Sequence, residues 1–149
     1  LVASRLEAAE RFGAVPLTAA TCDPAAAAAG RTEGRGADAA IEAVGTPEAT
    51  RQAADLLRPG GRLAALGVHT EPHLALSPGE LYDRNLRYAA GRCPARHYMP
   101  AALALAASQE ERIAGLVSHR LPLSDGVDAY RRFAAREAGW NKVVLHPGG

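Results

Sequence analysis

The fold is decided by residues 36–68, which read GADAAIEAVGTPEATRQAADLLRPGGRLAALGV. The stretch 37–44, which Gly45 ends, is typical of a strand. Thr46-Pro47 then predicts a helix start, because Thr favours the N-cap and Pro the first helical position. The continuous apolar run 63–66 is expected of a strand covered on both faces. Strand, helix and strand in this order predict a parallel sheet with crossover helices, the α/β class.

The flanking sequence continues this alternation. Ser4 and Glu7 are spaced as a capping box for a helix that Gly13 ends. The helix that starts at Thr46 is expected to run through Arg58 and to stop at the following Pro-Gly-Gly. Further strands are expected at 14–17, 73–76, 86–90, 119–123 and 142–145, and further helices at 24–29, 100–116 and 124–133, the last with Ser124 as N-cap.

Length and charge restrict the classes of function. The chain has 149 residues, a size that suits about one domain, and 17 Lys plus Arg against 16 Asp plus Glu give a net charge of +1. This near neutrality argues against nucleic acid or an acidic membrane as the main partner. No run approaches the roughly 18 uncharged apolar residues of a membrane span. Cys22 and Cys93, outside any CxxC, favour a reducing compartment, and we expect a cytoplasmic protein.

A set of short motifs carries a resemblance to a known family. The motifs are residues 36–45, 57–62 and 66–68, followed by Asn85-Leu86-Arg87, Gly91-Arg92-Cys93-Pro94-Ala95-Arg96, His119-Arg120-Leu121-Pro122-Leu123 and Lys142-Val143-Val144-Leu145. Each motif is weak alone, but their order and spacing resemble the second half of a medium-chain, zinc-dependent alcohol dehydrogenase. The resemblance covers essentially the whole chain.

The resemblance implies a partial Rossmann fold, that is, a doubly wound parallel sheet lacking its first two strands, followed by an α/β tail of the catalytic domain. Residues 1–91 would form the nucleotide-binding part and residues 92–149 the catalytic-domain segment. Leu1 falls just after the family's second strand, so we expect a C-terminal fragment. The strand over 37–44 would then expose unpaired backbone groups, and the chain alone is expected to be unstable, prone to aggregation and inactive.

The same resemblance implies where a nicotinamide cofactor, NAD or NADP, would lie. Ligands of open parallel sheets sit outside the carboxyl ends of the strands, and in the family small residues there let the nicotinamide ring approach closely. A basic side chain lies by the adenosine ribose at the position of Arg5, and a cation on the pyrophosphate at that of Lys142. The implied cofactor-binding set is Arg5, Val44, Gly45, Leu66, Gly67, Val68, Ala89, Ala90, Gly91 and Lys142. Without the family, Gly45 and Gly67 are also explained as turn glycines, and Arg5 and Lys142 as solvated surface cations.

No catalytic residue and no metal ligand is assigned to this chain. Zinc needs three or four ligands in a tetrahedral array, and Cys93 and His97 have no second Cys near them in sequence. In the family, zinc is present in the intact enzyme, and its ligands lie upstream of the matched region. Glu42 sits next to a strand end of the expected cofactor site and could hydrogen-bond the cofactor or a group that supports it.

The predicted function is therefore that of an oxidoreductase fragment that transfers hydride between an alcohol and NAD(P) and supplies part of the cofactor pocket. The substrate would be a small alcohol or aldehyde, and His73–Leu76 matches the edge segment through which family members form homo-oligomers. The choice between NAD and NADP stays open, because the deciding residue would precede Leu1.

Two alternatives remain. Residues 57–63 also fit the turn and strand of an S-adenosylmethionine-dependent methyltransferase, which the continuation through 91–96 disfavours. A non-catalytic remnant, or one half of a split dehydrogenase, would share the ancestry and differ only in activity.

Overall fold

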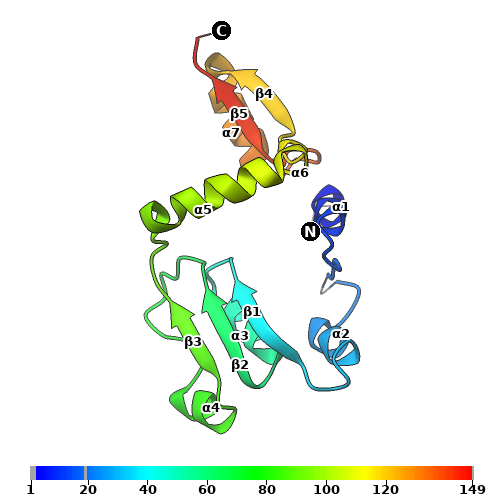
Figure 1. The fold of residues 1–149 in the computed structure, drawn as a ribbon, viewed down its shortest axis with the longest axis vertical. Helices are drawn as coiled ribbons and strands as arrows, with labels where there is room; N and C mark the ends of the chain where they lie inside the picture. The colour runs from blue at the N-terminus through cyan, green and yellow to red at the C-terminus, as the bar shows by residue number, and fades with distance from the viewer. Residues whose placement is uncertain (1–2, 19, 149) are drawn as a thin grey trace. The chain divides into compact units, whose positions relative to one another are not determined.

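The computed structural model describes residues 3–18 and 20–148, which fall into two compact units (Figure 1). The terminal unit joins residues 3–17 to residues 95–148, and the central unit spans residues 18–94. The first helix of the chain therefore belongs with the C-terminal third, an association that local sequence patterns do not encode. The division into family domains at residues 91 and 92 stays a prediction.

The central unit contains a three-stranded parallel sheet with the order β1-β2-β3. The strands are β1 (Ala37–Glu42), β2 (Leu57–Ala65) and β3 (Arg87–Ala90), and the helices are α2 (Pro24–Gly30), α3 (Pro47–Asp55) and α4 (Pro78–Asp83). Helix α3 connects β1 to β2, and α4 lies on the connection from β2 to β3. Parallel strands joined through helices confirm the predicted α/β class. Within the described residues, β1 is paired along one edge only, with β2.

Helices α3 and α4 begin at side chains that suit an N-cap. Thr46 Oγ1 accepts a hydrogen bond from Ala49 N at 3.2 Å, as the Thr-Pro pattern predicts. Ser77 and Glu80 form a complete capping box: Glu80 N donates to Ser77 Oγ at 3.1 Å, and Ser77 N donates to Glu80 Oε2 at 3.0 Å. These caps satisfy donors that a first helical turn leaves free. They fix where each of the two helices begins.

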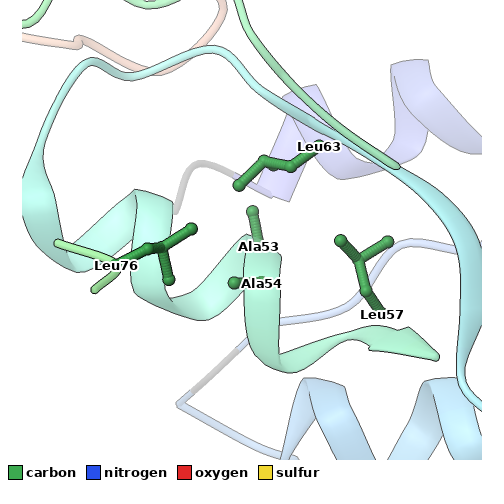
Figure 2. Packing of buried hydrophobic residues seen from close by; sticks show 5 residues of the cluster. All are labelled: Ala53, Ala54, Leu57, Leu63 and Leu76. Atoms are coloured by element: carbon green, nitrogen blue, oxygen red, sulfur yellow. The ribbon is translucent and has the colours of Figure 1, made fainter. Parts of the chain in front are cut away.

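The core of the central unit lies between α3 and β2 (Figure 2). Ala53 and Ala54 of α3 pack with Leu57 and Leu63 of β2 and with Leu76. The small alanine side chains let the helix approach the sheet closely, and Ala54 and Leu63 are 0% and 1% exposed. Burial of each leucine contributes roughly 1.5–3 kcal/mol. This packing anchors β2, the middle strand of the sheet.

Strand β2 begins earlier than the sequence predicts. Helix α3 ends at Asp55 and Leu57 already pairs with β1, so the helix expected through Arg58 is wrong. Residues 58–61 follow as an irregular stretch across which the register with β1 shifts. Proline and a positive-φ glycine, Gly60 at φ +76, fit such a bulge, whereas a regular central ladder would exclude them.

The strand expected at 73–76 is also wrong. These residues form bends and join neither sheet. Leu76 is 3% exposed and belongs to the core cluster, so the apolar character of the segment serves packing instead of strand pairing. Homo-oligomerisation through His73–Leu76 stays a prediction.

The terminal unit combines helices with a two-stranded parallel sheet, β4-β5. Its elements are α1 (Ala3–Arg11), α5 (Ala95–Ser108), α6 (Glu110–Ala114), β4 (His119–Pro122), the 3-10 turn η1 (Leu123–Asp125), α7 (Gly126–Ala134) and β5 (Val143–His146). Gly13, at φ +84, follows the end of α1 as predicted. Across the described part of the chain, no helix is both long and apolar enough to cross a membrane.

Two predictions near the N-terminus are wrong. Ser4 is not an N-cap, because α1 already includes Ala3, and Ser4 Oγ is buried with no hydrogen-bond partner in the described part of the chain. Residues 14–17 form no strand, since no other strand among the described residues pairs with them. An extended segment becomes a strand only where a neighbour satisfies its backbone groups.

The helix starts predicted at Pro100 and Ser124 are wrong as well. Pro100 lies inside α5, which begins at Ala95. The helix continues past Pro100 although proline has no N–H to donate to the preceding turn. The long helix expected over 100–116 is interrupted at Gln109, between α5 and α6. Ser124 lies within η1, and α7 follows with Asp125 at its N-cap and no side-chain capping bond.

Candidate functional site

The carboxyl ends of the three central strands lie level with one another. Glu42 of β1 pairs with Ala65 of β2, and Ala65 pairs with Ala90 of β3. The cofactor-binding residues expected in the central unit, 44–45, 66–68 and 89–91, therefore gather at one edge of the sheet, which we call the carboxyl edge. Ligands of open parallel sheets bind outside this edge.

Three aliphatic side chains stand exposed at the carboxyl edge. Val44 is 72% exposed, Leu66 66% and Val68 83%. Single exposed aliphatic residues are ordinary, but here they follow two adjacent parallel strands at the same level. Binding sites for small organic ligands are lined mainly by apolar side chains with a few polar groups. The carboxyl edge thus offers apolar surface to a small organic ligand.

Gly45 and Gly67 bring the two turns at this edge into direct backbone contact. A Cβ on Gly67 would lie 2.5 Å from Gly45 Cα, and a Cβ on Gly45 would lie 2.5 Å from the carbonyl oxygen of Val68. Gly45 also has φ +91, a conformation that side chains disfavour. These glycines are therefore required by the approach of one turn to the other, in agreement with the turn-glycine interpretation. A role in admitting a cofactor ring stays a prediction.

A buried carboxylate joins the same two turns. Glu42 is 2% exposed, and its Oε1 accepts hydrogen bonds from Val44 N at 2.5 Å and Gly45 N at 2.7 Å. Its Oε2 lies 2.9 Å from His69 Nε2, in the turn that follows β2. The backbone carbonyl of Glu42 also accepts from Leu66 N at 2.7 Å. One residue thus bonds to both turns through its main chain and its side chain.

These hydrogen bonds keep Glu42 ionised. The N–H of Gly45 contributes most to lowering the pKa of the carboxyl group, and the N–H of Val44 and the His69 side chain lower it further. Burial opposes them by raising the pKa, because it disfavours the charged form. The donors outweigh burial, and the pKa lies below its ordinary value. An ionised carboxylate only accepts, so His69 Nε2 donates to it.

In the terminal unit, the two expected cofactor-binding cations lie around one short segment, residues 140–142. Arg5 Nη2 donates to the carbonyl oxygen of Trp140 at 3.2 Å, and the guanidinium lies 5.9 Å from the centre of the Phe133 ring. Lys142 precedes β5, and its carbonyl accepts from Ser118 N at 2.9 Å. Arg5 is therefore held by a backbone carbonyl and an aromatic face, in contrast to a freely solvated cation.

Two adjacent hollows flank this segment. One is lined in part by Arg5, Phe133 and Asn141, and the other in part by Phe133, Asn141 and Lys142. Asn141 Oδ1 is buried and has no hydrogen-bond partner among the residues that the structure describes. Arg5 and Lys142 therefore line two different hollows of the terminal unit that share Phe133 and Asn141.

Several residues of these sites escape the sequence interpretation. His69 bonds Glu42 from the turn that follows β2, and the only sequence signal for this contact is that both residues lie near the carboxyl ends of adjacent parallel strands. Ser118 Oγ accepts from Asn141 N at 3.0 Å and Lys142 N at 3.2 Å. The Trp140 ring stacks on His119 with centroids 3.9 Å apart. These contacts link the start of β4 to the segment before β5, and no sequence motif predicts them.

The described residues do not fit a zinc ion. No group of three or more His, Cys, Asp or Glu side chains among them is arranged to hold a metal. Cys22 and Cys93 are both free thiols, the first half-buried and the second exposed. We therefore derive no step that passes through a metal on these residues.

Comparison with known proteins gives consistent matches. The family model "zinc-binding dehydrogenase" matches residues 1–108. Alcohol dehydrogenase from Cupriavidus necator is 36% identical over 149 residues, covering 96% of this chain and 40% of that protein. Zinc-type alcohol dehydrogenase B from Aspergillus flavus is 38% identical over 117 residues, covering 78% of this chain and 27% of that protein.

Solved structures agree. An alcohol dehydrogenase from Thermus sp. ATN1 superposes with a TM-score of 0.88 at 33% identity, over 98% of this chain and 42% of that chain. One from Thermotoga maritima gives a TM-score of 0.84 at 27% identity, over 97% and 41%. The chain thus spans at most about two-fifths of the relatives it matches here, and nothing in these comparisons supports a methyltransferase. With the family model covering more than half of its length, this chain belongs to the zinc-binding dehydrogenases.

Proposed function

We propose that this chain forms part of an alcohol dehydrogenase that transfers hydride between an alcohol or aldehyde and NAD or NADP. The chain would supply part of the cofactor pocket. The proposal rests on family membership together with one observation, the level carboxyl edge at which the turns after β1 and β2 present exposed aliphatic residues.

The central unit would bind the nicotinamide end of the cofactor. Val44, Leu66 and Val68 offer apolar contact to a ring, and the Gly45–Gly67 contact holds their turns close together. The bound cofactor would accept or deliver the hydride. The contribution of these residues is position, because a reacting ring must be held within a narrow range of geometry.

The terminal unit would bind the phosphate and ribose end. Arg5 and Lys142 supply positive charge in two hollows that share Phe133 and Asn141. A charge-assisted hydrogen bond to a phosphate oxygen is about twice as strong as a neutral one. Lys142 would act as a point charge, since an ammonium lacks the planar fork of a guanidinium.

Zinc dependence, assembly and location follow from the family and from the sequence. We assign no metal ligand to this chain, so a catalytic zinc would be held by other residues. We further propose a homo-oligomer, and a cytoplasmic location in keeping with the free thiols of Cys22 and Cys93.

The complete natural protein that carries this sequence provides the test. Isothermal calorimetry with NAD and with NADP should show saturable binding of one of them. An alcohol should then increase the absorbance of reduced nicotinamide in the presence of the bound cofactor. Absence of binding to both cofactors, in a folded protein, would overturn the proposal.

A matched pair of variants locates the site. Val68→Asp places a charge at the carboxyl edge and should weaken cofactor binding, because the nicotinamide ring would meet a carboxylate instead of an aliphatic group. Val127→Asp is the control, since Val127 is similarly exposed, at 76%, but lies on α7 of the terminal unit and is not among the proposed cofactor-binding residues. Equal loss of affinity in the two variants would contradict the assigned location.

A further inference from the structure

We propose that Glu42 and His69 form a clasp that positions the nicotinamide end of the cofactor by holding the turns after β1 and β2 together. The clasp comprises the Glu42 carboxylate, the Val44 and Gly45 N–H groups and the His69 ring. This inference rests on the proposed function and adds to it two positioning residues, neither of which touches the reacting atoms.

The side chain of Glu42 forms hydrogen bonds to the turn after β1 and to the turn after β2. Oε1 takes two N–H groups of its own turn, and Oε2 takes the imidazole N–H from the turn of the neighbouring strand. Both carboxylate oxygens are therefore occupied. The backbone carbonyl of Glu42 accepts from Leu66 N at 2.7 Å and from Gly67 N at 3.2 Å, which extends the link into the second turn.

The hydrogen bonds of the clasp leave the two turns little room to move relative to each other. The backbones of Gly45 and Gly67 are already in contact, so the turns cannot move closer. The Glu42–His69 bond opposes their separation, because His69 directly follows Val68. Val44 and Val68, the exposed residues proposed to face the nicotinamide, each lie within two positions of a clasp member. A shift in the clasp therefore moves ligand-facing residues.

Apolar packing does not explain a charged group here. The apolar core of the central unit is the cluster of Ala53, Ala54, Leu57, Leu63 and Leu76, and Glu42 is not part of it. A buried carboxylate is costly unless every acceptor is matched with donors. What the charge adds is a strong, directional link between two short turns, at the edge where a parallel sheet binds its ligand.

The two side chains of the clasp differ in burial. The side chain of His69 is 23% exposed, whereas that of Glu42 is 1% exposed. Replacement of His69 should therefore be tolerated better than replacement of Glu42. Glutamine is similar in size to either residue and keeps polar atoms. At position 42 it removes a buried charge, whereas at position 69 it replaces a partly exposed ring, so His69→Gln is the milder variant.

The test is a double-mutant cycle on the complete natural protein. Glu42→Gln, His69→Gln and the double variant are compared with wild type by calorimetry with NAD and NADP, by kcat and cofactor KM, and by hydrogen exchange of peptides covering 43–46 and 66–70. Glu42→Gln should raise the cofactor dissociation constant about tenfold and His69→Gln somewhat less. The double variant should lose no more affinity than Glu42→Gln, because both act through one link. The change should fall on cofactor KM more than on kcat, and exchange should rise in both peptides.

Glu80→Gln is the matched control. Glu80 is also a carboxylate that accepts a backbone N–H, from Ser77, and pairs with a basic side chain, that of Arg51, but it lies in α4. This variant should lower thermal stability and leave cofactor affinity unchanged. Faster exchange in both peptides with an unchanged dissociation constant would overturn the clasp as a positioning device, although wild-type binding would still support the proposed function. Failure of the wild type to bind either cofactor would overturn both.

Discussion

Gly45 and Gly67 meet backbone to backbone at the ends of adjacent parallel strands, and a Cβ on Gly67 would lie 2.5 Å from Gly45 Cα. Neither turn can move away from the other easily. Leu66 N and Gly67 N are bonded to the carbonyl of Glu42, and Gly45 N is bonded to the carboxylate of the same residue. The contact is therefore a fixed feature of the carboxyl edge.

The first prediction is that Gly67→Ala destabilises the protein. The added methyl group would overlap backbone atoms that cannot rotate away, so the two turns must separate, at a cost of about 1–3 kcal/mol or more. Thermal unfolding of the complete protein measures this cost. Cofactor affinity should fall as well, since Val68 moves with its turn.

Gly79→Ala serves as the control for this variant. A Cβ on Gly79 would meet only Ser77 Oγ, at 3.7 Å, inside helix α4. Alanine in a helix interior gains up to about 1 kcal/mol over glycine. Gly79→Ala should therefore be neutral or stabilising, and a destabilisation equal to that of Gly67→Ala would contradict the steric argument.

The second prediction concerns the pH dependence of stability. The backbone N–H of Ser77 contributes most to lowering the pKa of Glu80, and the Arg51 guanidinium adds to it, so the pKa falls from 4.5 to about 2. A group with a depressed folded-state pKa stabilises the native state above its unfolded pKa and loses this contribution as the pH falls through the folded value. Glu80→Gln should thus melt below wild type at neutral pH.

The melting curves then provide a direct check. The difference in melting temperature between wild type and Glu80→Gln should be constant above about pH 5 and shrink as the pH falls from 4.5 toward 2. Both residues of the pair are more than a third exposed, so the difference should be small and should decrease in high salt. A difference that grows on acidification would show that the sign is wrong.

The third prediction addresses the support of Lys142. Ser118 Oγ accepts from Asn141 N and Lys142 N and donates to the Lys142 carbonyl at 3.0 Å. Ser118→Ala removes these three bonds, together with the 3.0 Å contact between Ser118 Oγ and His119 Nδ1, and leaves the partly buried N–H of Asn141 without its acceptor, which should cost about 1–3 kcal/mol. Because the same bonds fix the backbone of Lys142, cofactor affinity should fall together with stability.

Ser108→Ala distinguishes this effect from the general loss of a hydroxyl. Ser108 Oγ donates one bond, to the Leu105 carbonyl at 2.8 Å, at the exposed end of α5. That variant should change the free energy of unfolding by no more than about 0.5 kcal/mol. An equal loss of cofactor affinity in both variants would contradict the claim that Ser118 supports cofactor binding by fixing the backbone of Lys142.

Local patterns predict the parts of this molecule that depend on neighbours in sequence. The strands expected over 37–44 and 86–90, which correspond to β1 and β3, are confirmed, as are the start of α3 at Thr46-Pro47 and the end of α1 near Gly13. Since parallel strands end at one edge of a sheet, the clustering of 44–45 and 66–68 also follows from the sequence.

The unpredicted parts depend on contacts between distant residues. Glu42 and His69 are 27 positions apart, and only the register of β1 and β2 brings them together. The segments 14–17 and 73–76 have the composition of strands but find no partner among the described residues, and Leu76 is used as a core side chain instead. Strand formation is decided by a neighbour, which composition does not reveal.

The last prediction is that the 149-residue chain produced alone does not melt cooperatively. Within the described residues, β1 is hydrogen-bonded only to β2, and Ile41 on β1 is 68% exposed. An open, apolar strand edge is a site for pairing with another chain, so the product should aggregate in sedimentation and show a broad thermal transition. Ile41→Lys should reduce aggregation, because charge on an edge strand opposes pairing, without restoring cooperative melting. A monomer with one sharp transition would show instead that the open edge is no liability and that the sheet needs no further strand.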